Sequence, residues 1–262
     1  MIHDSAIIDP SAKLGNGVSI GPWSIIGPNV ELGDNVEIAS NVIVKGPSRI
    51  GSGVRIYQFA TVGEDTPAFA YAGESSILEI GENTVIREGV TIHRGMDKGG
   101  IGRTEVGSHC LLMAYVHVGH DCIVGDHVIM ANNASLAGHV EVGDYANFGG
   151  YAGVPQFRKI GAYTHIAAMS LVTKDVPAYM TVSGNPAYAF GMNTEGMKRR
   201  GYDNETIEQL KQAYRTVYRK GLRVQEALDA LAPMRSQSAE VELFAASVEV
   251  SAKGIIRARS AN

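Results

Sequence analysis

The sequence predicts an all-β domain, wound as a triangular parallel β-helix, followed by a smaller α-helical domain. An apolar residue recurs at every sixth position over most of the stretch from Ile2 to Val172, and residues that form tight corners follow it. Beyond about residue 190 the apolar spacing becomes helical instead. Hexapeptide repetition is the sequence signature of a parallel β-helix. We therefore expect residues 1–190 to form the β-helix and residues 191–262 the helical domain.

The apolar position of the repeat runs in three blocks, and the register breaks between them. We expect these side chains to stack inside the prism as one continuous core column. They are Ile2, Ile8, Leu14, Ile20, Ile26, Leu32, Ile38, Val44, Ile50, Ile56 and Val62, then Ile80, Ile86 and Ile92, then Val106, Leu112, Val118, Val124, Met130, Leu136, Val142, Phe148, Val154, Ile160, Ile166 and Val172.

The other positions of each hexapeptide fit one short strand and one corner. Gly, Asp or Asn commonly follows the apolar residue, as in Leu14-Gly15-Asn16, and these residues tolerate the positive φ angles of sharp corners. A small or β-branched residue, such as Val18, stands four positions after each apolar residue. Three such units make one coil of about 18 residues that pairs with the coils above and below it.

Two segments leave this register, at about residues 63–79 and 95–104. Insertions in a solenoid are extruded as loops, often on the functional side. Either segment taken alone also fits a tolerated surface loop.

Helical signals begin at about Thr194. Asp203 or Asn204 can cap a helix that ends near Gly221, after the basic pair Arg219-Lys220. A second helix is expected over 224–232, stopping at Pro233, and a third over 241–250. The apolar face of the first helix carries Ile207, Leu210, Tyr214 and Val217.

Composition excludes several classes of function. The net charge of −4 over 262 residues does not suggest a nucleic-acid surface. The chain has no long apolar run and no signal-peptide pattern, so we expect no integral membrane segment and a cytoplasmic location. Cys110 and Cys122 stand two hexapeptides apart, on different faces of the prism, and are expected to be buried free thiols.

Four of the eight histidines, His93, His117, His120 and His139, lie in the middle coils next to the two loops. His120 stands two residues after an interior position, so it can point outward, and Asp121 can fix its tautomer. A neutral histidine with a pKa of about 6.5 suits general-base work at neutral pH. On spacing alone, catalysis, metal binding and a plain surface histidine all remain open.

Several long segments resemble one family, the UDP-N-acetylglucosamine O-acyltransferases that begin lipid A synthesis. The resemblance covers the chain almost end to end and implies a left-handed β-helix. The matching segments are RIYQFATVGE (55–64), VIREGVTIHRG (85–95), HVGHDC (117–122), ANNASLAGHVEVGD (131–144), MNTEGMKRRGY (192–202) and KGIIR (253–257).

The resemblance implies transfer of an (R)-3-hydroxyacyl chain from acyl carrier protein to the glucosamine 3-hydroxyl. His120 matches the general base and Asp121 the residue that orients it. The backbone N–H of Gly138 matches the oxyanion donor, which is worth roughly 3–4 kcal/mol in other acyl-transfer enzymes. His139 matches a histidine near the thioester. No metal or cofactor is implied, because the thioester is already activated.

The same resemblance implies a homotrimer with the site between subunits. The positions that hold or line the nucleotide-sugar site are His93, His117, Gln156, Asn193, Glu195 and Arg199. Arg199 and Arg200 also suit a phosphate or the acidic carrier protein. Ala168 matches the residue that ends the acyl groove, and its size suggests an intermediate chain length.

Three positions depart from the family pattern, all on the substrate side. Ala68 and Ala70 replace an Asp and a Lys in the first loop, and Pro155 replaces a His. A paralogue acting on a different UDP-amino sugar or acyl donor is therefore an alternative, as is a non-catalytic trimeric binding protein. A zinc lyase of the γ-carbonic-anhydrase type uses a similar coil, but the spacing of His117 and His120 resembles the acyltransferases instead.

Overall fold

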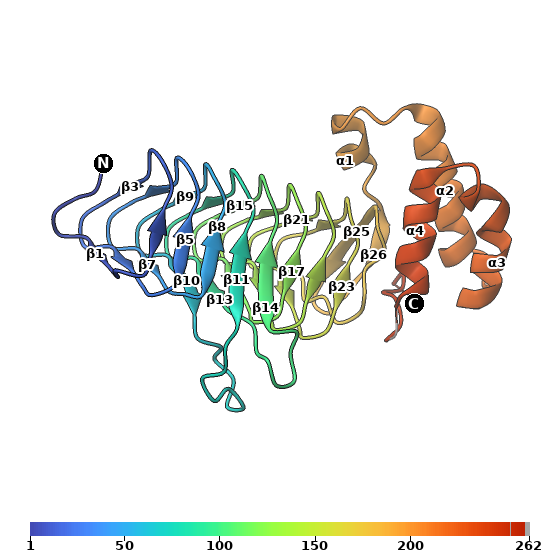
Figure 1. Ribbon diagram of the computed structural model, residues 1–262. Helices are drawn as coiled ribbons and strands as arrows, with labels where there is room; N and C mark the ends of the chain where they lie inside the picture. Colours follow the sequence, from blue (N-terminus) through green and yellow to red (C-terminus); the bar gives the residue numbers. More distant parts are fainter. Residues whose placement is uncertain (252, 260–262) are drawn as a thin grey trace.

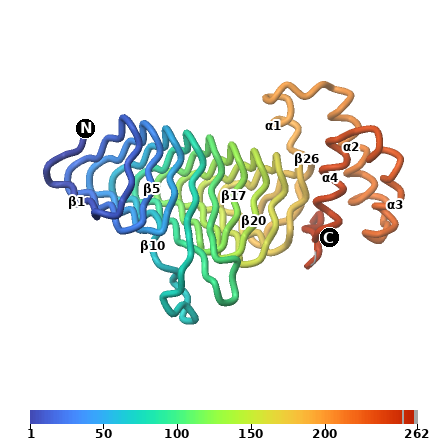
Figure 2. The backbone as a smooth tube through the Cα atoms, viewed as in Figure 1, coloured from blue at the N-terminus to red at the C-terminus, as the bar shows by residue number. Residues whose placement is uncertain are grey.

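The computed structural model describes residues 1–251 and 253–259, and its main body is a triangular β-helix (Figures 1 and 2). Strands of successive coils pair in parallel, as Ile7 does with Ile25 and Ile129 with Asn147. Each of these offsets is three hexapeptides, so the predicted coil is confirmed.

The strands form three sheets, which are the three faces of the prism. We number them in the order in which the chain visits them. Sheet 1 contains β1 (Ile7–Ile8), β4 (Ile25–Ile26), β7 (Ile43–Val44), β10 (Thr61–Glu64), β13 (Thr91–His93), β16 (His117–Val118), β19 (Ser135–Leu136) and β22 (Gly153–Val154). Sheet 2 contains β2 (Lys13–Leu14), β5 (Val30–Leu32), β8 (Ser48–Ile50), β11 (Ile77–Ile80), β14 (Arg103–Val106), β17 (Ile123–Val124), β20 (Glu141–Val142) and β23 (Lys159–Ile160). Sheet 3 contains β3 (Ser19–Ile20), β6 (Glu37–Ile38), β9 (Arg55–Ile56), β12 (Val85–Ile86), β15 (Leu111–Leu112), β18 (Ile129–Met130), β21 (Asn147–Phe148), β24 (His165–Ile166), β25 (Met180–Gly184) and β26 (Ala187–Met192).

The core is the predicted apolar column together with the column of small residues beside it. From Ile20 onward the apolar positions are buried, and Val36 and Val54 of the second column are fully buried. Ile2 stays 45% exposed because no coil covers the N-terminal end. Cys110 and Cys122 are buried and unpaired, as expected.

Both insertions project from the corner between sheets 1 and 2 (Figure 1). Leu78 pairs with Ser48 before it and with Thr104 after it, and the inserted residues make both offsets longer than the three hexapeptides of a regular coil. The loops themselves cover residues 65–76 and 94–102, so the predicted segments also included strand residues at their ends.

The C-terminal end of the β-helix is closed by the antiparallel hairpin β25–β26 and then by helices (Figure 1). These are α1 (Thr194–Arg199), α2 (Asn204–Tyr218), α3 (Val224–Arg235) and α4 (Ala239–Glu249). The expected boundary at residue 190 falls within β26, and the two-domain division stays a prediction. No helix in the described ranges is long and apolar enough to cross a membrane.

The helix termini agree with the sequence except at Pro233 and in the last helix, where α4 spans Ala239–Glu249 instead of the predicted 241–250. Asp203 caps α2, since its carboxylate accepts from the N–H of Thr206. The prediction that the next helix stops at Pro233 is wrong, because α3 continues to Arg235. A proline near a helix end removes only one backbone hydrogen bond, and the N–H of Ser236 still donates to the carbonyl of Ala232.

Candidate active site

His120 lies at the corner between sheets 1 and 2, directly after β16. The side chain is largely buried, with the residue 7% exposed. Its Nδ1 lies 2.7 Å from Oδ2 of Asp121. Because a carboxylate only accepts hydrogen bonds, Nδ1 carries the proton and Nε2 of the neutral ring is left as the acceptor. This is the tautomer that a general base needs.

The second loop holds Asp121 in place. The Asp121 carboxylate accepts hydrogen bonds from the backbone N–H groups of Met96 at 3.1 Å and Ile101 at 2.8 Å. Its own N–H donates to Oγ1 of Thr104. Burial alone raises the pKa of Asp121, but the bonds from His120 and from the two loop N–H groups outweigh it and hold the pKa below its usual value. Asp121 is therefore ionised at neutral pH.

Sequence reasoning missed the supporting groups Met96, Ile101 and Thr104. Two of the three act through backbone N–H groups, which leave no trace in side-chain identity. The available signal was the position of the second loop beside the histidine coils.

Gly138 lies one coil beyond His120, and its missing side chain makes room for the imidazole. A Cβ placed on Gly138 would lie 2.5 Å from Nε2 of His120. Within the described residues, the N–H of Gly138 makes no hydrogen bond, whereas the N–H of neighbouring His139 donates to the carbonyl of His120. A free N–H beside a general base is the arrangement that an oxyanion site requires.

His139 completes this group. Its ring meets the edge of His120 at 4.9 Å between centroids and stacks on Phe157 at 4.4 Å. Burial lowers the pKa of His139, so it is neutral at pH 7. One ligand atom from each of His120, Asp121 and His139 lies within 4.8 Å of the others, close enough for a metal ion. The hydrogen bond that already joins His120 to Asp121 favours acid–base chemistry over metal binding.

His93 and His117 lie side by side on sheet 1, close to this group, with ring centroids 5.4 Å apart. Nδ1 of His93 bonds the carbonyl of Asp65 at 2.7 Å, which ties the first loop to the sheet. Nδ1 of His117 bonds Oγ1 of Thr91 at 2.8 Å. The pKa of His117 is lowered by burial and then by the nearby histidines. Gln156 is exposed, one coil beyond Gly138.

The remaining expected site residues lie on a different face. Asn193, Glu195, Arg199 and Arg200 line a groove of about 690 Å³ over sheet 3. Asn193 caps α1 and donates from Nδ2 to the carbonyl of Tyr163 at 2.9 Å.

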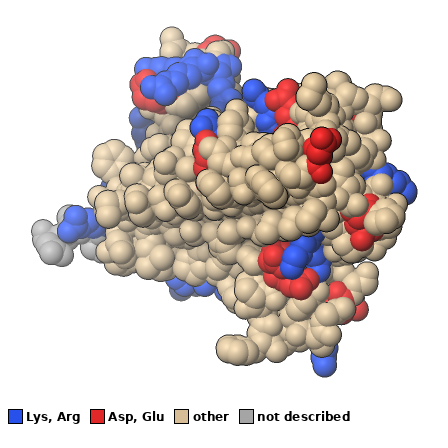
Figure 3. Space-filling model, turned by 90° about the vertical axis from the view of Figure 1, so that its left-hand side faces the viewer, with Lys and Arg blue, Asp and Glu red and all other residues tan. Residues whose placement is uncertain are grey.

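The two cationic side chains of this groove, Arg199 and Arg200, come from the end of α1 and the residue that follows it. The guanidinium of Arg200 lies 4.2 Å from the ring centroid of Tyr145. Figure 3 shows basic side chains gathered where the helices project above the β-helix.

The structure brings His120, Asp121, Gly138 and His139 together, but it does not bring the groove residues Asn193, Glu195, Arg199 and Arg200 to them. Ala168 belongs to neither group. It is exposed at the corner between sheets 3 and 1.

The three departures lie at the corner between sheets 1 and 2 or in the loop that projects from it. Ala68 and Ala70 are in the first loop, whose base is fixed by an ion pair between buried Arg94 and Asp65. Glu64 is paired with Lys45. Pro155 lies in the corner next to Gln156.

Known proteins match this chain over nearly its whole length. A family model described as UDP N-acetylglucosamine O-acyltransferase, domain 2, matches residues 175–256, and a bacterial transferase hexapeptide model matches residues 1–33 and 103–138. Acyl-[acyl-carrier-protein]–UDP-N-acetylglucosamine O-acyltransferases of Stutzerimonas stutzeri and Saccharophagus degradans are 52% and 49% identical, covering 98% of this chain and 99% of each relative.

Solved structures of the same kind of enzyme are similar to this chain over nearly its whole length. The UDP-N-acetylglucosamine acyltransferase of Francisella novicida superposes with a TM-score of 0.95 at 40% identity, covering 98% of this chain and 94% of its own. The O-acyltransferase of Moraxella catarrhalis does so with a TM-score of 0.95 at 43% identity, covering 98% and 99%. The predicted left-handed β-helix with C-terminal helices is confirmed. The chain belongs to the family of acyl-[acyl-carrier-protein]–UDP-N-acetylglucosamine O-acyltransferases.

Proposed function

We propose that this protein transfers an (R)-3-hydroxyacyl chain from acyl carrier protein to the 3-hydroxyl of UDP-N-acetylglucosamine, the opening step of lipid A synthesis. The observation that carries the proposal is the His120–Asp121 pair, with Nε2 of His120 against Gly138. The substrates are inferred from the family to which the chain belongs, and the geometry of this pair supports acid–base catalysis of the transfer.

The reaction needs one base and one oxyanion site. Nε2 of His120 accepts the proton of the sugar hydroxyl while the hydroxyl oxygen attacks the carbonyl carbon of the thioester. Ionised Asp121 stabilises the imidazolium that forms. The free N–H of Gly138 donates to the carbonyl oxygen as it becomes negative. When the intermediate collapses, the C–S bond breaks and the departing thiolate takes the proton from His120. The products are the acylated nucleotide sugar and the carrier-protein thiol, with no metal or cofactor required.

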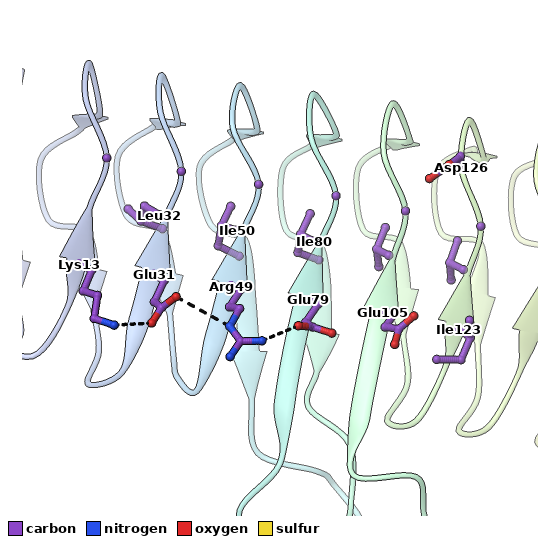
Figure 4. A pocket seen from close by; sticks show the side chains of 18 of the residues that line it. Lys13, Glu31, Leu32, Arg49, Ile50, Glu79, Ile80, Glu105, Ile123 and Asp126 are labelled. Atoms are coloured by element: carbon purple, nitrogen blue, oxygen red, sulfur yellow. Dashed lines mark hydrogen bonds and ion pairs between the residues drawn. The ribbon is translucent and has the colours of Figure 1, made fainter.

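The outward faces of the sheets support a homotrimer. On sheet 2, seven of the eight outward strand positions are charged, and Figure 4 shows Lys13, Glu31, Arg49 and Glu79 joined in one chain of ion pairs. On sheet 1, none of the eight corresponding positions is Lys, Arg, Asp or Glu. Sheet 2 therefore suits solvent and sheet 1 suits a partner.

The corner between sheets 3 and 1 carries an exposed apolar ridge. Its five large side chains are 65–72% exposed in the single chain, and exposed apolar patches often mark a protein contact. Asn41, Gly89 and Asn133 occupy the same corner in the coils between them. They are Trp23, Phe59, Tyr115, Tyr151 and Met169. A three-fold axis along this ridge would bury it and place sheet 3 of each subunit against sheet 1 of the next. Such a head-to-tail contact closes into a ring.

A trimer of this kind also explains why the site residues fall into two groups. The groove with Arg199 and Arg200 lies on sheet 3, whereas His117 and His120 lie on and beside sheet 1. In the trimer, sheet 3 of one subunit faces sheet 1 of the next, and this brings the two groups of site residues together. The nucleotide is then held by one subunit while the sugar hydroxyl reaches His120 of its neighbour. We place the reaction in the cytoplasm, in keeping with the two free buried thiols.

The first test is a transfer assay read by mass spectrometry. Purified protein is mixed with UDP-N-acetylglucosamine and a panel of (R)-3-hydroxyacyl carrier proteins, with His120→Ala as the control. We expect an acylated nucleotide sugar that depends on His120. Absence of product with every donor, while the nucleotide still binds, would mean either that the acceptor has changed or that the chain is a binding protein.

The departures at Ala68, Ala70 and Pro155 favour one second candidate, transfer to a different UDP-amino sugar. The same assay decides, because that candidate predicts product only when the acceptor is changed.

A subunit-mixing experiment tests the shared site. His120→Ala and Arg199→Ala subunits are each expected to be weakly active, but co-assembled trimers regain complete sites where an intact His120 faces an intact Arg199. Random mixing gives about a quarter of wild-type sites, since the two defects lie on opposite sides of one head-to-tail contact. No recovery would place both residues in a site built by one subunit.

A further inference from the structure

The groove over sheet 3 has a hydrogen-bonded polar pair, Asn147 and His165, on its floor. Its floor is formed by successive rungs of the sheet, Ile129, Asn147, His165 and Thr181, which are neighbours in register. Phe190 stands in the wall and is 68% exposed. Asn147 and His165 thus face the same space as the two arginines of the groove.

The hydrogen bond within this pair fixes what each side chain offers to a ligand. Nδ1 of His165 lies 3.1 Å from Oδ1 of Asn147. Because Oδ1 only accepts, Nδ1 carries the hydrogen, and Nε2 of the neutral ring is an acceptor. In the described part of the chain, Nδ2 of Asn147 has no hydrogen-bond partner and remains a donor. The pair therefore presents one donor and one acceptor side by side.

Burial and then the charge of Arg199 lower the pKa of His165. The ring is accordingly neutral at pH 7, and its Nε2 keeps the acceptor role.

We propose that Asn147 and His165 read the base of the nucleotide and select uracil over cytosine. Nδ2 of Asn147 donates to the O4 oxygen of uracil, while Nε2 of His165 accepts from its N3–H. Cytosine presents the reverse pattern, an amino group in place of O4 and a bare N3, and leaves donor facing donor and acceptor facing acceptor. The inference rests on the proposed function, which places a uridine nucleotide in this groove.

The rest of the groove fits a nucleoside diphosphate. Ile129 and Phe190 offer apolar surface for the base, and Arg199 and Arg200 offer charge for the diphosphate. Arg200 is held in position by its contact with Tyr145. A base inserted beside Asn147 and His165 would leave its phosphates near these arginines, because all these residues line one continuous cavity of about 690 Å³.

The decisive variant is Asn147→Asp. An aspartate accepts where the amide donated, and its charge keeps the neighbouring imidazole protonated, so that Nε2 becomes a donor. Both groups then match cytosine instead of uracil. The probes are UDP and CDP themselves, bound to the purified full-length protein and followed by calorimetry. Acyl transfer to the UDP- and CDP-amino sugars is measured alongside.

We expect the wild type to favour UDP by about 10- to 100-fold, the range that one well-placed pair of base contacts supplies. Asn147→Asp is expected to reverse or abolish this preference. Asn83→Asp, the same substitution at an exposed corner outside the groove, is the matched control and should leave the preference unchanged. His165→Leu removes the acceptor and should bring the two affinities within a few-fold, which provides a second test if the aspartate variant does not fold.

An unchanged ratio of UDP to CDP affinity in folded Asn147→Asp or His165→Leu protein would overturn the inference. It would mean that the pair only links two neighbouring strands and has no effect on which base is bound. This outcome can be distinguished from failure of the proposed function, because in that case the wild-type protein itself would transfer no acyl chain.

Discussion

Replacing Gly138 by Ala tests the geometry of the base directly. Gly138 has an ordinary backbone conformation, and the nearest obstacle to a methyl group is the His120 ring, 2.5 Å away at Nε2 and 2.6 Å at Cε1. The ring must retreat about 0.9 Å before the nearer contact reaches an ordinary 3.4 Å. A misplacement of about 1 Å in a catalytic group reduces the rate by roughly 100-fold. Overpacking of this kind also costs about 1–3 kcal/mol of stability.

The assay compares kcat, KM and thermal unfolding for Gly138→Ala in two backgrounds. In the wild type we expect kcat to fall about 100-fold with little change in KM, because Gly138 is not among the residues that line the nucleotide groove. In the His120→Ala background the three nearest atoms are absent, so the loss of stability should become smaller. The reasoning is refuted if Gly138→Ala keeps wild-type kcat, or if it destabilises both backgrounds equally.

Three further predictions follow from other parts of the molecule. Ala70→Lys should raise kcat/KM for UDP-N-acetylglucosamine by roughly 10-fold, since a regained hydrogen bond to a charged group is worth about 1.5 kcal/mol or more; no gain in steady-state kinetics would show that the departure is neutral. Tyr115→Glu should convert the trimer to monomers in analytical ultracentrifugation, because it places three like charges along the apolar ridge, whereas Asn83→Asp should not. Wild-type stability should fall as the pH drops below about 6.5, where the unfolded chain gains a proton that His117, with its lowered native pKa, resists. The stability of the His117→Gln variant, measured by thermal unfolding, should fall less between pH 7 and 5 than that of the wild type. Parallel curves of stability against pH for the two proteins would contradict this prediction.

The sequence was informative wherever the repeat is regular. A period of six implies that residues three hexapeptides apart are stacked neighbours, and this arithmetic alone places Gly138 on His120 and His139 on Asp121. The same arithmetic located both loops, because only an insertion can break the register. At Pro233 the sequence was a poor guide, because proline strongly opposes helix formation in the interior but is tolerated near the end of a helix.

The sequence by itself determined the coil, the core columns and the family, because each depends on local spacing or on long matching segments. Tertiary structure alone decided which backbone N–H groups of the second loop hold Asp121, since the path of an irregular loop depends on packing rather than on period. It also placed Arg199 and Arg200 over sheet 3, away from His120, in the groove that Asn147 and His165 line. Those contacts join aperiodic segments to the prism, and the repeat carries no information about where such segments return.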